Sequence, residues 1–288
     1  MNNIRYHAPK TLIEAVKYLA DNPDVKIIAG GTDLYVGWAK QGYKDMHLMD
    51  IRNIENFADV KEVGDSIFIG AGALMSDLQY SEFVLKNYPI LSEAAGRVGS
   101  VQMRNMATVG GNSCNAAPSA DTVTPLIVYA AEAVIVSVKG ERKIELRDFF
   151  KGVGKTVLEQ GEMLKGFLLP KPSSKSAAVF VKHSRRVAMD LATVSVSVNV
   201  IADKNNNFKD VRIAMGVVSP TPVFVNEFDE FYGTPIDNYK TIKKMVEIAA
   251  AKTTPRTSLR GTKEYREDMI NLHLEESLKK AVEMIKNK

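Results

Sequence analysis

The 288-residue sequence predicts an α+β fold of about two domains, since one domain typically takes roughly 150 residues. Two observations lead to this class. In the N-terminal half, short apolar runs that end in glycine turns alternate with segments of helical periodicity. Beyond residue 176, a run that alternates strictly between apolar and polar residues precedes helical segments, which is typical of an antiparallel sheet followed by helices.

The first third of the chain predicts a β-α-β unit. Residues 11–20 read as a helix that begins with a capping box, Thr11 followed by Glu14, and carries apolar residues at helical spacing. The apolar run 25–29 is short enough for a buried strand and ends in a glycine pair. Residues 46–51 predict the next strand, after a loop that contains Gly42.

A second unit begins near Ser66, where residues 66–73 predict a strand that runs into a glycine turn. A capping box, Ser76 with Gln79, predicts a helix as far as Lys86. The remaining predicted elements are helices over 89–98 and 122–131 and a strand over 133–139.

Residues 99–121 are rich in Gly, Asn and Ser and only weakly periodic, so they predict a long loop. Long ordered loops in compact domains are usually functional.

The C-terminal part follows a predicted linker at residues 171–176. Residues 193–199 alternate valine with polar residues, 204–207 predict a hairpin turn, and 211–218 predict the return strand. The last fifty residues predict helices, with one apolar stripe: Leu274, Leu278, Val282 and Ile285.

Composition excludes several classes. One cysteine, Cys114, rules out an internal disulfide framework and an iron–sulfur cluster held by this chain alone, which needs about four ligands. The four histidines are scattered, which argues against a zinc site. No apolar run approaches the roughly 20 residues of a membrane span, and the N-terminus lacks a signal-peptide core. We therefore expect a cytoplasmic protein that does not bind a membrane.

The net charge of +4 is concentrated after Tyr239, where 12 Lys and Arg face 7 Asp and Glu. This basic end fits either an acidic partner or the solvated faces of helices. Basic and aromatic residues are not interleaved, so we expect no nucleic-acid site.

Two glycine pairs, Gly30-Gly31 and Gly110-Gly111, are the candidates for chemistry. Paired glycines allow positive φ and can present successive N–H groups to an anion. Together they could hold the two phosphates of a dinucleotide, although either pair alone could be a tight turn. The sequence lacks the P-loop pattern and the Rossmann glycine fingerprint, which argues against those nucleotide-binding folds.

Two longer motifs carry a family resemblance that covers essentially the whole chain. Residues 28–34 (Ile-Ala-Gly-Gly-Thr-Asp-Leu) and 104–112 (Arg-Asn-Met-Ala-Thr-Val-Gly-Gly-Asn) resemble the FAD-binding, or medium, subunit of the molybdenum hydroxylases. Residues 118–121, 188–190 and 255–266 extend the match, which resembles bacterial xanthine dehydrogenases most. The resemblance implies a two-lobed FAD-binding domain of the vanillyl-alcohol-oxidase (PCMH) type at 1–170, with lobes near 1–55 and 56–170. A C-terminal domain of the CO dehydrogenase flavoprotein type would follow at 177–288.

The same resemblance implies the site. Residues 27–34 would wrap the pyrophosphate and place Leu34 against the isoalloxazine, and residues 108–112 would form a second phosphate cradle. Asp121 would accept a hydrogen bond from a ribose hydroxyl. Val98 and Leu164 would contact the cofactor, and Lys182 would either face the flavin or be a surface lysine. The implied cofactor-binding residues are Ile27, Ile28, Ala29, Gly30, Gly31, Thr32, Asp33, Leu34, Val98, Thr108, Val109, Gly110, Gly111, Asn112, Asp121, Leu164 and Lys182.

Covalent flavin attachment would need His or Cys at the first glycine turn, which reads Thr32-Asp33, so we expect dissociable FAD. Cys114 is either redox-active or, as we favour, a buried thiol. Arg185, Arg186 and Asp190 either steer a nicotinamide dinucleotide or form structural ion pairs.

Three functions remain open. The resemblance implies an electron-transfer subunit with no catalytic residue or metal ligand of its own. It would take electrons from a 2Fe-2S small subunit beside a molybdopterin-binding large subunit, and it would reduce NAD⁺. Within this first function, the alternative is the FAD subunit of a related hydroxylase of CO, nicotinate or another aromatic heterocycle, with a different acceptor. The alternatives are a self-sufficient flavoprotein, for which we find no acid–base set, and a non-catalytic nucleotide-binding module.

Overall fold

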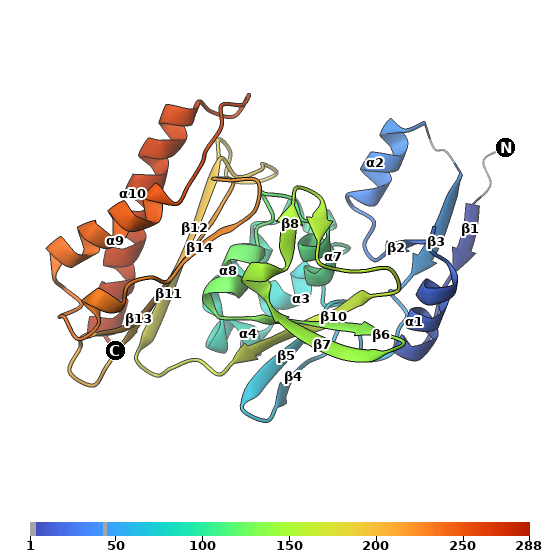
Figure 1. The fold of residues 1–288 in the computed structure, drawn as a ribbon, viewed down its shortest axis with the longest axis horizontal. Helices are drawn as coiled ribbons and strands as arrows, with labels where there is room; N and C mark the ends of the chain where they lie inside the picture. Colours follow the sequence, from blue (N-terminus) through green and yellow to red (C-terminus); the bar gives the residue numbers. More distant parts are fainter. Residues whose placement is uncertain (1–3, 43–44) are drawn as a thin grey trace.

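A small parallel sheet forms one end of the molecule, which is blue in Figure 1. The computed structural model describes residues 4–42 and 45–288. The elements at this end are β1 (Ile4–His7), α1 (Leu12–Asp21), β2 (Lys26–Ile28), α2 (Leu34–Lys40) and β3 (Met46–Asp50). β3 lies between β1 and β2 and runs parallel to both, which confirms the predicted β-α-β unit.

The first helix begins as predicted, and the second was missed. The Glu14 N–H donates to Thr11 Oγ1 at 3.2 Å, which is the hydrogen bond of an N-cap. α2 occupies the stretch for which the sequence predicted only a loop around Gly42. Its interior contains Gly37, a poor helix former, so tertiary packing rather than propensity holds this helix.

A five-stranded antiparallel sheet forms the middle of the molecule, in the order β4-β5-β10-β6-β7. Its strands are β4 (Val60–Val63), β5 (Ser66–Gly70), β6 (Glu132–Ser137), β7 (Gly140–Glu145) and β10 (Met163–Pro170). Between β7 and β10 lie a short 3₁₀ helix, η1 (Leu146–Asp148), and a small hairpin of β8 (Phe150–Gly152) and β9 (Lys155–Thr156).

Six short helices accompany this sheet, and all of them except α6 contribute buried residues to its hydrophobic core. They are α3 (Met75–Tyr80), α4 (Glu82–Asn87), α5 (Pro89–Gly96), α6 (Val101–Arg104), α7 (Val109–Cys114) and α8 (Val123–Val128). The predicted capping box at Ser76 was wrong, because Ser76 lies inside α3. The predicted helix breaks at Ser81, whose extended backbone and side chain cap α4 by accepting the Val84 N–H at 3.3 Å.

The predicted loop over 99–121 was also wrong in part, because it contains α6 and α7. Each is only one or two turns long, too short to produce a detectable 3.6-residue period.

The C-terminal part is an antiparallel sheet in the order β11-β12-β13-β14, followed by helices, as predicted. Its elements are β11 (Ser176–His183), β12 (Val194–Ala202), β13 (Phe208–Gly216), β14 (Val223–Val225), η2 (Asp229–Phe231), α9 (Tyr239–Ala251) and α10 (Lys263–Lys286). Figure 1 shows α9 and α10 on the outer side of this sheet and α8 on its inner side.

The alternation along β12 separates these two sides. Its valines share a hydrophobic core with the apolar stripe of α10. Its polar residues face α8, where Ser197 Oγ donates to Thr124 Oγ1 at 2.9 Å and Asn199 Nδ2 donates to the Val128 carbonyl at 3.3 Å. The sheet therefore packs against both the C-terminal helices and the N-terminal part, and its loops reach the surface of the latter.

Candidate functional site

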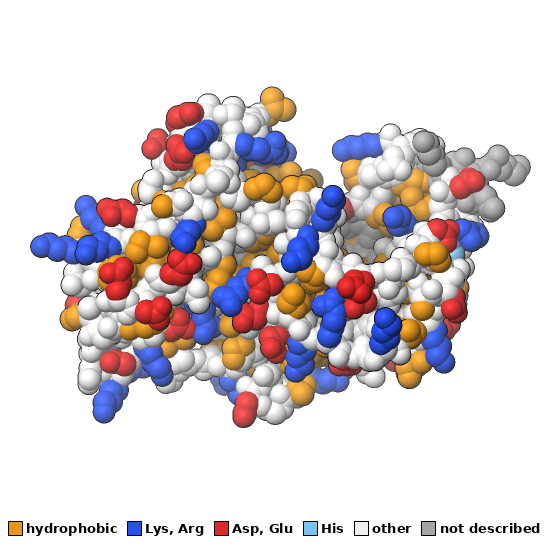
Figure 2. Space-filling model, viewed as in Figure 1, with side chains coloured by type: hydrophobic (Ala, Val, Ile, Leu, Met, Phe, Trp, Pro, Cys, Tyr) orange, Lys and Arg blue, Asp and Glu red, His pale blue; other side chains and the backbone are white. Residues whose placement is uncertain are grey.

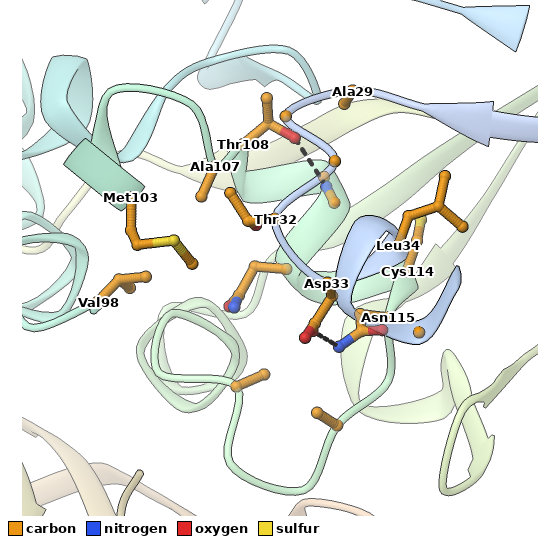
Figure 3. A pocket seen from close by; sticks show the side chains of 18 of the residues that line it. Ala29, Thr32, Asp33, Leu34, Val98, Met103, Ala107, Thr108, Cys114 and Asn115 are labelled. Atoms are coloured by element: carbon orange, nitrogen blue, oxygen red, sulfur yellow. Dashed lines mark hydrogen bonds between the residues drawn. The ribbon is translucent and has the colours of Figure 1, made fainter. Parts of the chain in front are cut away.

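A cavity of about 890 Å³ lies where the three parts of the chain meet. This volume is within the roughly 300–1,000 Å³ of small-molecule sites. Its walls come from the β2–α2 connection, from α7 and its flanking segments, and from two C-terminal loops, 184–191 and 252–262. In Figure 2 the upper surface is hollowed between two lobes, and Figure 3 shows the cavity from close by.

The first glycine pair forms a turn between β2 and α2. Gly31 has φ +69°, in the left-handed region that favours glycine. Gly30 lies so close to the chain that a Cβ would stand 1.9 Å from the Met106 carbonyl oxygen. Asn115 Nδ2 donates to the Asp33 carboxylate, a contact drawn in Figure 3. The turn is thus fixed against the segments that flank α7.

The second glycine pair differs from our expectation. Gly110 and Gly111 lie inside α7 without positive φ. The N–H groups of Val109 and Gly110 donate to the carbonyls of Ala73 and Ala71 at 3.0 and 2.9 Å, and the Gly111 N–H donates to Thr108 Oγ1 at 3.0 Å. The prediction of a left-handed turn with free N–H groups was therefore wrong here: the pair joins a helix to the end of β5.

A buried ion pair stands at the back of the cavity. Lys182 Nζ donates to Asp121 Oδ2 at 2.7 Å and to the Arg97 carbonyl at 2.9 Å, and both side chains are less than 10% exposed. Asp121 Oδ1 is buried and has no partner among the described residues, although Asp121 lines the cavity. A buried acceptor without a partner is rare, so this oxygen is available to a ligand hydroxyl.

Burial and the neighbouring cations act on the Asp121 carboxyl in opposite directions. Burial raises the pKa of Asp121 to about 6, against the opposing attraction of Lys182 and Arg97. Because Asp121 neutralises Lys182, little of the lysine charge remains for a ligand in the cavity.

The C-terminal wall of the cavity carries Arg186, Met189, Asp190, Leu191 and Arg260. Burial opposes ionisation of Asp190. The N–H groups of Arg186 and Leu191, with the charges of Arg186 and Arg185, nevertheless hold the pKa of Asp190 below its usual value. The Arg186 Nε lies 3.8 Å from the Asp190 carboxylate. An ion pair of the kind expected for these residues is therefore present, at the mouth of the cavity.

All but two of the predicted site residues line the cavity. Those that do are Ile27, Ile28, Ala29, Gly30, Gly31, Thr32, Asp33, Leu34, Val98, Thr108, Gly110, Gly111, Asn112, Asp121 and Leu164. Val109 is fully buried in the core, and Lys182 reaches the cavity only through Asp121.

Sequence reasoning missed several residues of the lining. Trp38 is the clearest, since it stands four residues after Leu34 on α2 and would have been found had that helix been predicted. Met103, Asn115 and Arg260 had no comparable signal, because the fold brings them to the cavity from distant segments.

Cys114 also lines the cavity. Burial raises the pKa of its thiol to about 12. The thiolate is the reactive form, so this environment favours an inert thiol.

No group of three or more His, Cys, Asp and Glu side chains within 4–42 and 45–288 is arranged to hold a metal ion. No helix in the same part of the chain is both long and apolar enough to cross a membrane.

The arrangement fits a dinucleotide such as FAD. The Gly30-Gly31 turn brings backbone without side chains to the cavity, and Asp121 offers a buried acceptor without a partner, which suits a ribose hydroxyl. Residues from all three parts of the chain line the cavity, as an extended ligand such as a dinucleotide requires.

Comparisons with known proteins agree with this chemistry. Residues 2–172 match the FAD binding domain in molybdopterin dehydrogenase, and residues 179–281 match the CO dehydrogenase flavoprotein C-terminal domain. The chain is 34% identical over 279 residues to the putative xanthine dehydrogenase FAD-binding subunit of Escherichia coli K12, covering 96% of this chain and 94% of that protein. It is 29% identical to the carbon monoxide dehydrogenase medium chain of Afipia carboxidovorans, over 98% of both chains.

A solved structure gives the same result. The structure superposes on a chain of carbon monoxide dehydrogenase from Hydrogenophaga pseudoflava with a TM-score of 0.90, at 28% identity and 97% coverage of both chains. The predicted fold, an FAD-binding domain with a C-terminal antiparallel sheet domain, is confirmed. The chain belongs to the FAD-binding medium subunits of the molybdenum hydroxylases, which are flavin-dependent oxidoreductases.

Proposed function

We propose that this chain is the electron-transfer subunit of a xanthine dehydrogenase-like hydroxylase, with NAD⁺ as acceptor. It would receive electrons from the 2Fe-2S clusters of a small subunit, which obtains them from a molybdopterin-binding large subunit. Two electrons and one proton would leave as a hydride to NAD⁺. The closeness to an E. coli xanthine dehydrogenase FAD-binding subunit supports this assignment, and we propose a cytoplasmic location for the complex.

FAD, when bound, supplies the redox chemistry, since a flavin handles one-electron and two-electron steps. The chain supplies the binding surface. We propose that the segment 27–34 approaches the pyrophosphate, that the segment 108–112 packs beside it, and that Asp121 accepts a ribose hydroxyl. The unpartnered Asp121 oxygen is the observation that carries this proposal. We also propose domain boundaries at 1–170 and 177–288.

The role of Lys182 changes from the one the resemblance implied. Its ammonium group is bound to Asp121 and to the Arg97 carbonyl. We propose that it fixes the carboxylate so that the free oxygen faces the ribose, rather than offsetting charge on the flavin. Val98, Leu164 and Leu34 would then supply the apolar contacts.

The direct test is the visible spectrum of the purified chain after incubation with FAD and desalting, followed by anaerobic NADH. We expect a retained flavin spectrum that NADH bleaches. Retained flavin that dithionite bleaches and NADH does not would exclude NAD⁺ as acceptor. Absence of flavin from the folded chain, both alone and with its partner subunits, would exclude the cofactor assignment.

A variant tests the residue assignment separately. Asp121→Ala should weaken FAD binding by about 1–3 kcal/mol, because it removes a hydrogen bond to a charged group. Titration of the apoprotein with FAD measures this loss. An unchanged dissociation constant would remove Asp121 from the site.

A further inference from the structure

A short turn at the mouth of the cavity carries an arginine that no described residue neutralises. The N–H of Ser258 donates to the Gly261 carbonyl at 3.0 Å, and the N–H of Gly261 returns to the Ser258 carbonyl at 3.2 Å. Leu259 and Arg260 form the tip of this turn, and Arg260 lines the cavity. In Figure 1 the start of α10, which follows the turn, and α2 both lie on the upper side of the molecule.

A buried arginine anchors this turn. The side chain of Arg266, on the first turn of α10, donates from Nη2 to Ser258 Oγ at 2.8 Å. Its Nη1 donates to the Thr193 carbonyl, and also to the Val217 carbonyl at 3.4 Å. Thr193 ends the connection that carries Arg186 and Asp190. One guanidinium therefore ties together both C-terminal segments that wall the cavity.

Arg266 is an unusual anchor, because it is only 3% exposed and forms no ion pair with a described carboxylate. Buried charges are normally paired, and leaving one unpaired is costly. Burial and the nearby guanidinium groups of Arg256 and Arg260 lower the pKa of Arg266 below its usual value. Charge pairing thus does not explain the position of Arg266, whereas its hydrogen bonds to three chain segments do.

The backbone beside this anchor is strained. Val217 has φ +66°, which is a rare conformation for a β-branched residue. Its N–H donates to the Pro118 carbonyl at 3.1 Å, and its own carbonyl accepts from Arg266. Such strain persists only where surrounding contacts over-determine the conformation, and it gathers at functional sites.

Carboxylates balance only part of the positive charge at the mouth of the cavity. Among the described residues, no carboxylate forms an ion pair with Arg260, and the only one near Arg186 is Asp190 at 3.8 Å. Deeper in the cavity, by contrast, Lys182 is neutralised by Asp121. An unpaired guanidinium presents several donors in a planar fork that matches phosphate.

We propose that Arg260 binds a phosphate group of a dinucleotide at the mouth of the cavity, and that buried Arg266 is the positioning residue that holds it there. This inference deepens the proposed function and rests on it. The phosphate has two sources, the pyrophosphate of FAD or that of the nicotinamide acceptor. Both share the chemistry that Arg260 recognises, and the experiment separates them.

The first test compares two arginines of the same loop. Arg260→Met removes the guanidinium at the cavity, whereas Arg256→Met removes one that does not line it and that forms no side-chain hydrogen bond with a described residue. The measurements are the FAD dissociation constant of the apoprotein and, by calorimetry, the ADP-ribose dissociation constant of the FAD-loaded protein. We expect Arg260→Met to weaken one of them about tenfold and Arg256→Met to leave both within about twofold.

The outcome identifies the source of the phosphate. A loss of FAD affinity assigns Arg260 to the cofactor, and a loss of ADP-ribose affinity with FAD retained assigns it to the acceptor. Equal dissociation constants for Arg260→Met and the wild type would overturn the proposal.

The second test concerns Arg266. If it acts by positioning Arg260, then Arg266→Met should reproduce the binding loss of Arg260→Met, and the double variant should lose no more than either single variant. Arg266→Lys should restore part of the affinity, because an ammonium group can still reach the two carbonyls. A purely structural role would lower the melting temperature and leave the dissociation constants unchanged, which would overturn the positioning role.

If Arg266→Met fails to fold, Ser258→Ala replaces it. This change removes the hydroxyl that accepts from Arg266 and, at 3.2 Å, from the Arg260 backbone N–H, and it leaves the guanidinium bound to its two carbonyls. We expect an affinity loss in the same ligand as for Arg260→Met, smaller in size. No loss in either ligand would again overturn the positioning role.

These results are independent of the proposed acceptor. If NADH does not reduce the wild-type flavin but Arg260→Met weakens FAD or ADP-ribose binding, the NAD⁺ proposal fails and this one stands. If NADH reduces the wild-type flavin and Arg260→Met changes neither affinity, this proposal fails and the NAD⁺ proposal stands.

Discussion

The two glycine pairs at the cavity have the same dipeptide sequence and different physical roles. At the first, Gly31 adopts φ +69° and Gly30 lies against the Met106 carbonyl, so the chain reverses there without side chains. At the second, Gly110 and Gly111 are helical, and their N–H groups are engaged by Ala71 and by Thr108. Only the first pair forms a turn with left-handed backbone.

This difference shows that a glycine pair can be required for either of two distinct physical reasons. The first pair is needed for backbone conformation and for a close approach to the chain. The second is needed for packing, since a Cβ on Gly110 would stand 2.5 Å from the Cβ of Ala71. Substitutions at the two pairs should therefore fail in different ways.

The largest expected effect is at Gly30. A Cβ there would collide with a backbone carbonyl that cannot move alone, so Gly30→Ala should lower the free energy of unfolding by about 3 kcal/mol. Urea unfolding measures this loss. Gly37→Ala is the matched control, because a Cβ there meets nothing within 4 Å and lies inside α2. It should raise stability by about 0.5–1 kcal/mol. Equal effects of the two variants would contradict the close approach at Gly30.

The next largest effect is the pH dependence of stability that comes from Asp121, which follows α7 in the chain. Its folded-state pKa of about 6 is above the unfolded value of about 3.9. The folded state therefore binds the proton more tightly between these values, and stability from this group is present at pH 4 and lost as the pH rises through 6. The free energy of unfolding of the wild type minus that of Asp121→Asn should therefore be about 2 kcal/mol larger at pH 4 than at pH 7. Parallel stability profiles for the two proteins would show that folding does not raise the pKa of this carboxyl.

A smaller effect separates the two pairs directly. Gly31→Ala should lower stability by about 1–2 kcal/mol, because the residue must keep a left-handed backbone. Gly111→Ala requires no such backbone, and its Cβ would meet only the Thr108 hydroxyl, at 2.9 Å. The loss there should stay below about 1 kcal/mol, within the range of a weakened helix cap. A larger loss at Gly111 than at Gly31 would reverse the comparison.

The smallest expected effect concerns Cys114, at the end of α7. With its thiol pKa raised to about 12, the residue should not react with a thiol reagent at pH 8 in the folded protein, and it should react at once in urea. Labelling followed by mass spectrometry distinguishes these states. Rapid labelling of the folded chain would mean that this end of α7 opens readily.

Local patterns predicted much of the fold. The capping box at Thr11, the short apolar runs and the alternation along 193–199 each depend on neighbours in sequence, and the structure confirms the elements they predict. The missed helices are short or contain glycine, so tertiary contacts hold them and propensity does not reveal them.

The candidate site divides in the same way. Its glycine motifs could be found because they are continuous in sequence and resemble a known family. The pair of Asp121 with Lys182 joins residues 61 positions apart, and the bond from Arg266 to the Thr193 carbonyl joins residues 73 apart. No spacing rule relates such residues, because the first contact exists only once the C-terminal sheet has packed against the N-terminal part and the second only once α10 has packed on that sheet.

The strand order of the middle sheet determines when this protein can fold during synthesis. β10, the last of its five strands in the sequence, occupies the centre, between β5 and β6. The two outer pairs, β4 with β5 and β6 with β7, can form as hairpins as they leave the ribosome, but they can join only through β10. The N-terminal hydrophobic core therefore stays open until residue 170 has emerged, and a nascent chain stalled before that point exposes unpaired strand edges to chaperones and to other chains.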